Sequence, residues 1–244
     1  MRRFLALAVS GWLCLTMSAR GAGYGDWAAI IVAGDWHAHS GAPSEVFDNA
    51  RRDLGMAFRR IGFAPDNILE FSVRPERYPG QNLLHSDKTM IADELWDLSN
   101  RATGGCLIYF TSHGSPDGVV VDDTQISPDS MARIIGNACG DRPTVVIIAA
   151  CYSGVFVPPL AAPNRMVFTA ARPDRPSFGC GEEDKYTFFD TCMLASLPGS
   201  SDFPGLARGV QACVAAREKK EDVYPSEPQL SIGDKVAAEL PSWR

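Results

Sequence analysis

The sequence predicts one α/β domain built on a mainly parallel β-sheet of about six strands. Short apolar runs alternate along the chain with segments whose apolar residues recur at helical spacing. No internal repeat or low-complexity linker divides the chain, which has 244 residues, 45% of them hydrophobic and 21% charged. This composition excludes disordered, collagen-like and multipass membrane classes. The net charge of −6 argues against a nucleic-acid-binding protein.

The first 22 residues have the three parts of a secretory signal peptide. Arg2 and Arg3 precede an apolar stretch over 4–17, and small residues follow up to Ala22. A buried helix or a membrane anchor would be the alternative, but the apolar stretch is short for a bilayer span. We therefore expect a signal peptide over 1–22, a single domain over 23–244, and a periplasmic or secreted product. No stable membrane anchor is expected after signal removal.

The first half of the domain predicts two strands and two helices. The run over 27–34 is continuously apolar and ends in glycine, as a buried parallel strand does. Ser44 is placed to cap a helix that Gly62 ends. A second strand over 68–73, a loop over 74–86 and a helix with inward residues from Ile91 to Ala102 follow.

The second half continues the alternation. Ser127 and Pro128 stand in the favoured order for the start of a helix. The remaining predicted elements are strands over 106–111, 144–150 and 166–170, a hairpin over 119–126, a helix around 206–214 and an edge strand over 229–232.

Two reactive side chains follow neighbouring predicted strands. His113 comes after the strand over 106–111, and Cys151 comes directly after the strand over 144–150. Ligand sites in parallel sheets lie beyond the carboxyl ends of the strands, so the two residues are expected to meet. A thiolate is a strong nucleophile, and imidazole protonates a leaving amine near neutral pH. Gly114 and Gly154 allow close approach of a substrate backbone.

The sequence around both residues resembles the legumain-like cysteine peptidases, family C13. The motifs that carry the resemblance are Leu107-Ile-Tyr-Phe-Thr-Ser-His113-Gly114-Ser115 and Val145-Val-Ile-Ile-Ala-Ala-Cys151-Tyr-Ser-Gly154. The run over 29–34 is similar to the first strand of the family. The segment over 168–178 is similar to its fifth strand and the substrate-aligning segment after it. In order, the likeness extends from about Trp27 to Leu197.

The resemblance implies a caspase-like three-layer sandwich and an endopeptidase that works through an acyl-enzyme. It implies that Cys151 is the nucleophile, that His113 is the general acid and base, and that the Gly114 N–H helps to hold the oxyanion. Pro176, Ser177 and Phe178 are expected to run alongside the substrate, and Glu183 or Asp184 to approach the specificity pocket. A peptide or protein is the expected substrate.

The preference for the residue before the cleaved bond (P1) stays open. Family members that cut after Asn carry an Arg near the position of Val46 and an acid at the position of Ala149. A pocket selects an amide by placing donors and acceptors, so preference for Asn is not expected here. Arg51, Arg52 or Arg172 would favour an acidic P1 residue, whereas Glu182, Glu183 and Asp184 would favour a basic one.

No cofactor or metal is expected. His37 and His39 form an H-x-H pair without a third ligand at matching spacing, which favours a polar loop near the site over a metal centre. The loop after Gly34 lacks the clustered glycines of a phosphate-binding loop, which argues against a flavodoxin-like binder. The alternatives kept open are a transpeptidase or ligase that uses the same dyad and a non-catalytic caspase-like binding protein. The oligomeric state is not predicted.

The seven cysteines divide by expected role. Cys14 lies in the signal segment and Cys151 is reserved as a nucleophile. One or two disulfides are plausible among the other five, for example between Cys180 and either Cys192 or Cys213.

Overall fold

The computed structural model describes residues 23–243, and the predicted signal segment over 1–22 lies outside them. Seven strands form one sheet in the order β10-β9-β8-β4-β1-β2-β3, and every neighbouring pair is parallel except β10 with β9. The chain adds strands outward on one side of β1 and then crosses to the other side with β4. The strands are β1 (Trp27–Ala33), β2 (Ile68–Ser72), β3 (Leu83–His85), β4 (Gly105–Thr111), β8 (Thr144–Ala149), β9 (Arg165–Thr169) and β10 (Gln229–Ile232).

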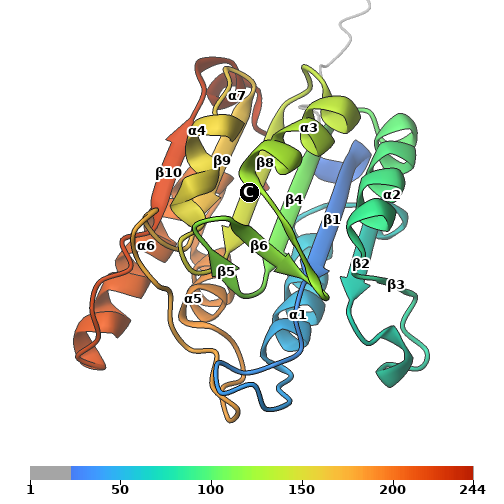
Figure 1. Ribbon diagram of the computed structural model, residues 1–244. Coiled ribbons are helices and arrows are strands. Elements are labelled where there is room, and N and C mark those ends of the chain that lie inside the picture. Colours follow the sequence, from blue (N-terminus) through green and yellow to red (C-terminus); the bar gives the residue numbers. More distant parts are fainter. Residues whose placement is uncertain (1–22, 244) are drawn as a thin grey trace, which may run out of the picture.

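Helices cover both faces of this sheet, so the molecule has three layers (Figure 1). Helices α1 (Val46–Arg60), α5 (Phe188–Ser196) and α6 (Phe203–Lys220) pack on one face. Helices α2 (Lys88–Arg101), α3 (Pro128–Cys139) and α4 (Val157–Leu160) pack on the other, and α7 (Asp234–Glu239) follows β10. A small antiparallel sheet of β5 (Gly114–Ser115), β6 (Gly118–Val121) and β7 (Thr124–Ile126) lies over the carboxyl end of β4. Within residues 23–243, none of the helices has the length and apolar character that a bilayer crossing requires.

The central strands β1, β4 and β8 are almost wholly apolar because both of their faces are buried. Ala29 and Ile31 of β1 point into the core beneath α1, α5 and α6, whereas Ile30 and Val32 point into the core beneath α2 and α3. One disulfide lies on each face of the sheet: Cys106–Cys139 joins β4 to α3, and Cys192–Cys213 joins α5 to α6.

Most predicted elements are present, including the hairpin, the antiparallel edge strand and the Ser127 cap, whose hydroxyl accepts from the Ser130 N–H. The sheet has one more strand than predicted, because the short β3 lies inside the segment read as a loop. Helix α5 was not predicted either. Helix α1 begins after Glu45, one residue later than expected, although the Ser44 hydroxyl accepts from the Val46 N–H.

The suggested pairing of Cys180 is wrong. Cys192 and Cys213 face each other from two packed helices and bond together, while Cys180 lies in the loop between β9 and α5 as a free thiol.

Candidate active site

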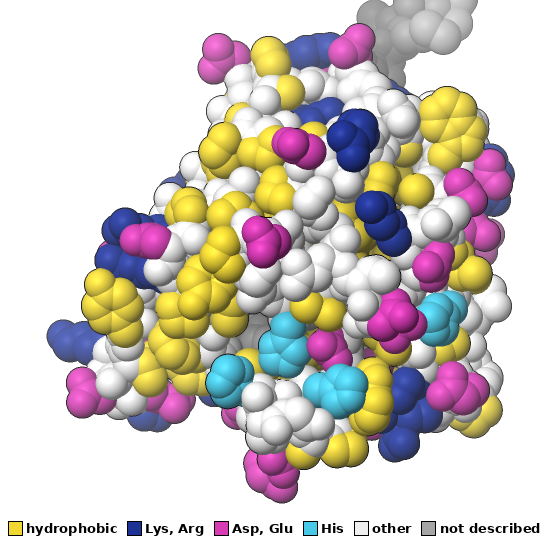
Figure 2. All heavy atoms as spheres, viewed as in Figure 1, with side chains coloured by type: hydrophobic (Ala, Val, Ile, Leu, Met, Phe, Trp, Pro, Cys, Tyr) yellow, Lys and Arg dark blue, Asp and Glu magenta, His cyan; other side chains and the backbone are white. Residues whose placement is uncertain are grey.

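The register of three central strands brings the predicted reactive residues to one level. Ala33 of β1 pairs with Thr111 of β4, and Thr111 pairs with Ala149 of β8. His113 and Cys151 each lie two residues beyond their paired strand residue, so both emerge at the same carboxyl edge. They line one small cavity at that edge. Figure 2 shows histidine side chains gathered around a hollow on the lower part of this face.

Cys151 sits on a tight turn after β8. The next residue, Tyr152, has a left-handed backbone with φ of 56°, which is uncommon outside glycine and is often found at functional sites. The Tyr152 N–H donates to the Arg175 carbonyl at 2.8 Å, which fixes the turn against the segment after β9. The turn therefore holds the Cys151 side chain at the carboxyl end of β8.

The imidazole of His113 is oriented by a backbone carbonyl. Its Nε2 lies 3.0 Å from the His37 carbonyl oxygen, and a carbonyl only accepts, so Nε2 carries the proton when the ring is neutral. The ring also packs edge-on against Phe47, with centroids 5.1 Å apart. Neutral His113 therefore has an unprotonated Nδ1, and no hydrogen bond within residues 23–243 engages that atom.

The loop that supplies this carbonyl is itself fixed by Asp35. One carboxylate oxygen of Asp35 accepts from the backbone N–H groups of Trp36 and His37 at 2.6 and 3.0 Å. The same oxygen lies 2.7 Å from Nδ1 of His37. Asp35 thus sets the turn from which the His37 carbonyl reaches His113.

Gly114 lies where a larger residue would not fit. A Cβ atom at this position would lie 2.4 Å from the Cys151 carbonyl oxygen and 2.9 Å from the Ala150 Cβ. The backbone after His113 can approach the nucleophile turn only because Gly114 has no side chain. This proximity is a precondition for the oxyanion role that the resemblance assigns to the Gly114 N–H.

The predicted substrate segment runs past the Cys151 sulfur. Sγ lies 3.3 Å from both the N–H and the carbonyl oxygen of Ser177. Phe178 lines the cavity and packs on Phe188, whereas Pro176 is half-buried beside the cavity-lining residues. Glu183 is exposed and is not among the residues that line the cavity.

Burial governs the acidity of both free thiols at the site. It raises the pKa of the Cys151 thiol above its ordinary value, and the hydrogen bond from the Ser177 N–H acts in the opposite direction. Burial, followed by the nearby Cys151 charge, raises the pKa of Cys180 to about 11. Cys151 is therefore a neutral thiol at neutral pH, and a nucleophilic role for it would require a base.

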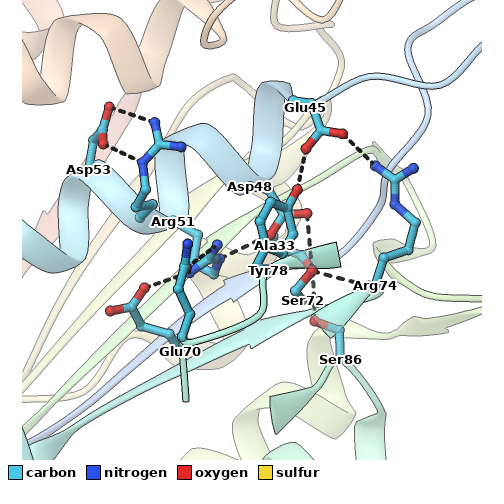
Figure 3. A network of polar contacts seen from close by, with 12 residues as sticks. Ala33, Glu45, Asp48, Arg51, Asp53, Glu70, Ser72, Arg74, Tyr78 and Ser86 are labelled. Atoms are coloured by element: carbon cyan, nitrogen blue, oxygen red, sulfur yellow. Dashed lines mark hydrogen bonds and ion pairs between the residues drawn. The ribbon is translucent and has the colours of Figure 1, made fainter. Parts of the chain in front are cut away.

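Arg51, one of the candidates for a basic pocket wall, belongs to a buried ion network beside the site (Figure 3). Its guanidinium is fully buried and donates to Asp48 at 3.0 Å and to Glu70 at 2.7 Å. Ser72 donates to the second oxygen of Asp48 at 3.1 Å. The charge of Arg51 is thus matched inside the fold and does not face the cavity.

The other charged candidates also lie outside the cavity-lining residues. Arg52 pairs with Asp53, and Arg172 pairs with Asp174 and Glu227. Glu182 accepts from the Ser40 hydroxyl, and Asp184 accepts from the Gly181 N–H. In the described part of the chain, His, Cys, Asp and Glu side chains form no group of three or more suited to a metal ion.

Several groups that form the site were not predicted from the sequence. The His37 carbonyl is a backbone group, and nothing in the sequence marks which carbonyl will face His113. Phe47, Cys180 and Thr187 line the cavity from α1 and from the loop before α5, and their positions depend on tertiary packing. Only the nearness of Cys180 to the substrate-aligning motif over 168–178 offered a signal.

Comparison with known proteins agrees with this geometry. The family model described as Peptidase C13 family matches residues 73–203, which include His113 and Cys151. A crystal structure of caspase-1 from Spodoptera frugiperda matches with a TM-score of 0.62 and 14% sequence identity, covering 87% of this chain and 88% of that chain. Curated protein sequences give no match. The fold is caspase-like, and the chain belongs to the peptidase C13 family, with a cysteine peptidase-like function.

Proposed function

We propose that the protein is an exported cysteine endopeptidase that cleaves peptides or proteins through a Cys151–His113 dyad. The observation that carries the proposal is the bond from His113 Nε2 to the His37 carbonyl. It leaves Nδ1 as the only basic nitrogen of a ring that lines the same cavity as the Cys151 thiol. A nucleophile beside an oriented base is the arrangement that acyl transfer requires.

The first half of the reaction forms an acyl-enzyme. Nδ1 of His113 takes the thiol proton as the Cys151 sulfur attacks the substrate carbonyl, which explains how a thiol with a raised pKa becomes nucleophilic. The Gly114 N–H stabilises the oxyanion of the tetrahedral intermediate. His113 then gives its proton to the departing amine, and the substrate acyl group remains on sulfur as a thioester.

The segment over 176–178 aligns the substrate in this scheme. The Ser177 backbone lies 3.3 Å from Sγ, so a peptide strand running beside it would present its carbonyl close to the sulfur. In the second half, His113 accepts a proton from water, the water oxygen attacks the thioester, and the sulfur leaves with the proton. An amine in place of water would give the transpeptidase reaction instead.

Export is supported by two independent features. The charged, apolar and small-residue regions over 1–22 occur in the order of a signal peptide. The two disulfides, one in each helical layer, suit a chain that folds in an oxidising compartment. N-terminal sequencing of the protein from the periplasm or medium should begin near Gly23, and a retained residue 1 would contradict export by this route.

Covalent labelling tests the nucleophile. The reduced, folded protein is treated with peptide acyloxymethyl ketones that vary at P1, and the adduct is located by peptide mapping. We expect one adduct, on Cys151, and none in Cys151→Ala. Cys180 is an internal control, since it is a second free thiol on the same cavity. An adduct on Cys180 in preference to Cys151, or no adduct with any P1 residue, would contradict the proposal.

A further inference from the structure

The cavity beside Cys151 carries no formal side-chain charge besides that of the dyad. Apart from His113 and Cys151, its walls are Phe47, Ser112, Ala149, Ala150, Ser177, Phe178, Cys180 and Thr187. No Asp, Glu, Lys or Arg is among the lining residues. A charged P1 side chain would lose its water here and gain no partner of opposite charge, which is costly.

Three hydroxyls line the cavity, those of Ser112, Ser177 and Thr187, and two of them are already used inside the protein. Ser112 donates to the Val120 carbonyl at 2.8 Å. Thr187 donates to Asp190 at 2.8 Å and accepts from the Asp190 N–H at 3.0 Å. Of the three, the Ser177 hydroxyl alone could meet a P1 amide without breaking one of these bonds, and an amide has an oxygen and two N–H groups to satisfy. The walls are therefore poorly suited to Asn and Gln as well as to charged residues.

The cavity is also small. The centre of a water-sized sphere can occupy only about 10 Å³ of it, so the cavity has room for no more than a small side chain. Its walls are held in place: Phe47 is 1% exposed, and Phe178 packs on Phe188. The Cys180 carbonyl accepts from the His39 N–H at 2.9 Å, which ties the loop of Cys180 to the loop after β1.

From these observations we infer that the protein cleaves after a small uncharged residue, namely Gly, Ala or Ser, and that Cys180 sets the size limit. The inference rests on the proposed function and specifies its substrate class. Cys180 packs against the cluster of Ala33, Val46 and Phe47 and forms part of the cavity wall. Because its side chain ends in one sulfur atom, shortening or lengthening it changes the pocket by a defined amount.

A P1 series on one peptide scaffold tests the inference. We measure kcat/KM, or the labelling rate of Cys151, with Gly, Ala, Ser, Val, Asn, Asp and Lys at P1. We expect Ala, Ser or Gly to exceed Asn, Asp and Lys by about tenfold or more, the scale on which pockets discriminate by size and unpaired polar groups. Preference for Asn, Asp or Lys would overturn the inference while leaving the peptidase proposal intact.

Two variants test the role of Cys180 itself. Cys180→Ala should raise the Val-to-Ala ratio of kcat/KM by about tenfold, and Cys180→Leu should lower the Ala-to-Gly ratio by a similar factor. A merely structural role would change all substrates equally and leave both ratios constant, which would overturn the assignment. Thermal melts show that each variant is folded. Failure of every substrate to label or acylate Cys151 would instead reject the proposed function, and this inference with it.

Discussion

The buried Arg51 network and the Cys151–His113 site lie beside each other but are built in opposite ways. Arg51 donates from its guanidinium to two buried carboxylates and to Gln81, and Asp48 is held from a second side by Ser72. At the site, the described residues give the Cys151 sulfur only the Ser177 backbone as hydrogen-bond partner. His113 uses one nitrogen and leaves the other for chemistry.

The difference separates structural from reactive polar groups. The network of Arg51, Asp48 and Glu70 fixes the position of α1 on β2. Its donors and acceptors bond to one another, so none of them is available to bind a substrate. A reactive site must keep a lone pair free of structural hydrogen bonds, here that of His113 Nδ1, and a proton that can be transferred, here that of the Cys151 thiol. The fold holds these groups in place by fixing the backbone around them. The left-handed Tyr152 and the close approach of Gly114 supply that rigidity.

The largest effect is expected at the free nitrogen of the site. His113→Gln removes the base, and kcat/KM should fall by roughly 10²–10⁴-fold while the melting temperature changes little. His85→Gln is the matched control, since His85 lies at the end of β3, is half-buried and has its Nε2 3.7 Å from an Asp122 oxygen. Equal rates for wild type and His113→Gln would contradict the dyad.

Substitution in the Arg51 network should instead change the stability of the fold. Arg51→Met leaves Asp48 buried without its cation and leaves Glu70 with Arg59 alone, and the free energy of unfolding should fall by about 3–5 kcal/mol. Arg52→Gln breaks a half-exposed pair on the same helix and should cost less than about 1 kcal/mol. Denaturant unfolding measures both free energies. Equal losses for the two variants would show that the buried network stabilises the fold no more than the half-exposed pair does.

The pH dependence of alkylation sharpens the picture of the resting nucleophile. Burial places the Cys151 pKa above its ordinary value, so its thiolate fraction should still be increasing as pH passes the usual thiol range. The rate of carboxamidomethylation of Cys151 by iodoacetamide, followed by peptide mapping, should therefore rise through pH 9.0 without a plateau. A plateau below the ordinary thiol pKa would indicate a preformed ion pair with His113.

The smallest effect is expected one step away from the dyad. Asp35→Ala removes the acceptor that holds the turn of His37, so the carbonyl behind His113 becomes less well placed. We expect roughly a tenfold loss in kcat with KM nearly unchanged, the effect of a misplaced positioning group. Asp35→Asn keeps an acceptor oxygen and should recover part of kcat. If KM rises instead and kcat holds, Asp35 acts on substrate binding.

The sheet and the reactive pair were predictable from the sequence because both depend on local patterns. Continuously apolar strands mark a parallel sheet, and strand-end placement brings His113 and Cys151 to one edge whatever the details of packing. The short β3 carries too little apolar pattern to be read, and no element was predicted over the segment that forms α5. The role of the His37 carbonyl and the pairing of Cys192 with Cys213 are tertiary facts that spacing does not encode.

The walls of the specificity pocket likewise depend on tertiary contacts that the sequence does not reveal. The sequence offered three arginines and three acids as candidates for its walls, and each type of charge is reasonable in isolation. The structure shows most of them paired elsewhere and none lining the cavity, because a charge finds its partner through the fold and not through its place in the chain.

Trapping the acyl-enzyme tests the central claim most directly. The protein is mixed with a nitrophenyl ester of a peptide that ends in Ala, quenched in acid within the first turnover, and mapped by mass spectrometry. The account predicts one equivalent of released nitrophenol and the peptide acyl group on Cys151, lost again as turnover completes. An acyl group on another residue, or nitrophenol release without any acylated protein, would contradict it.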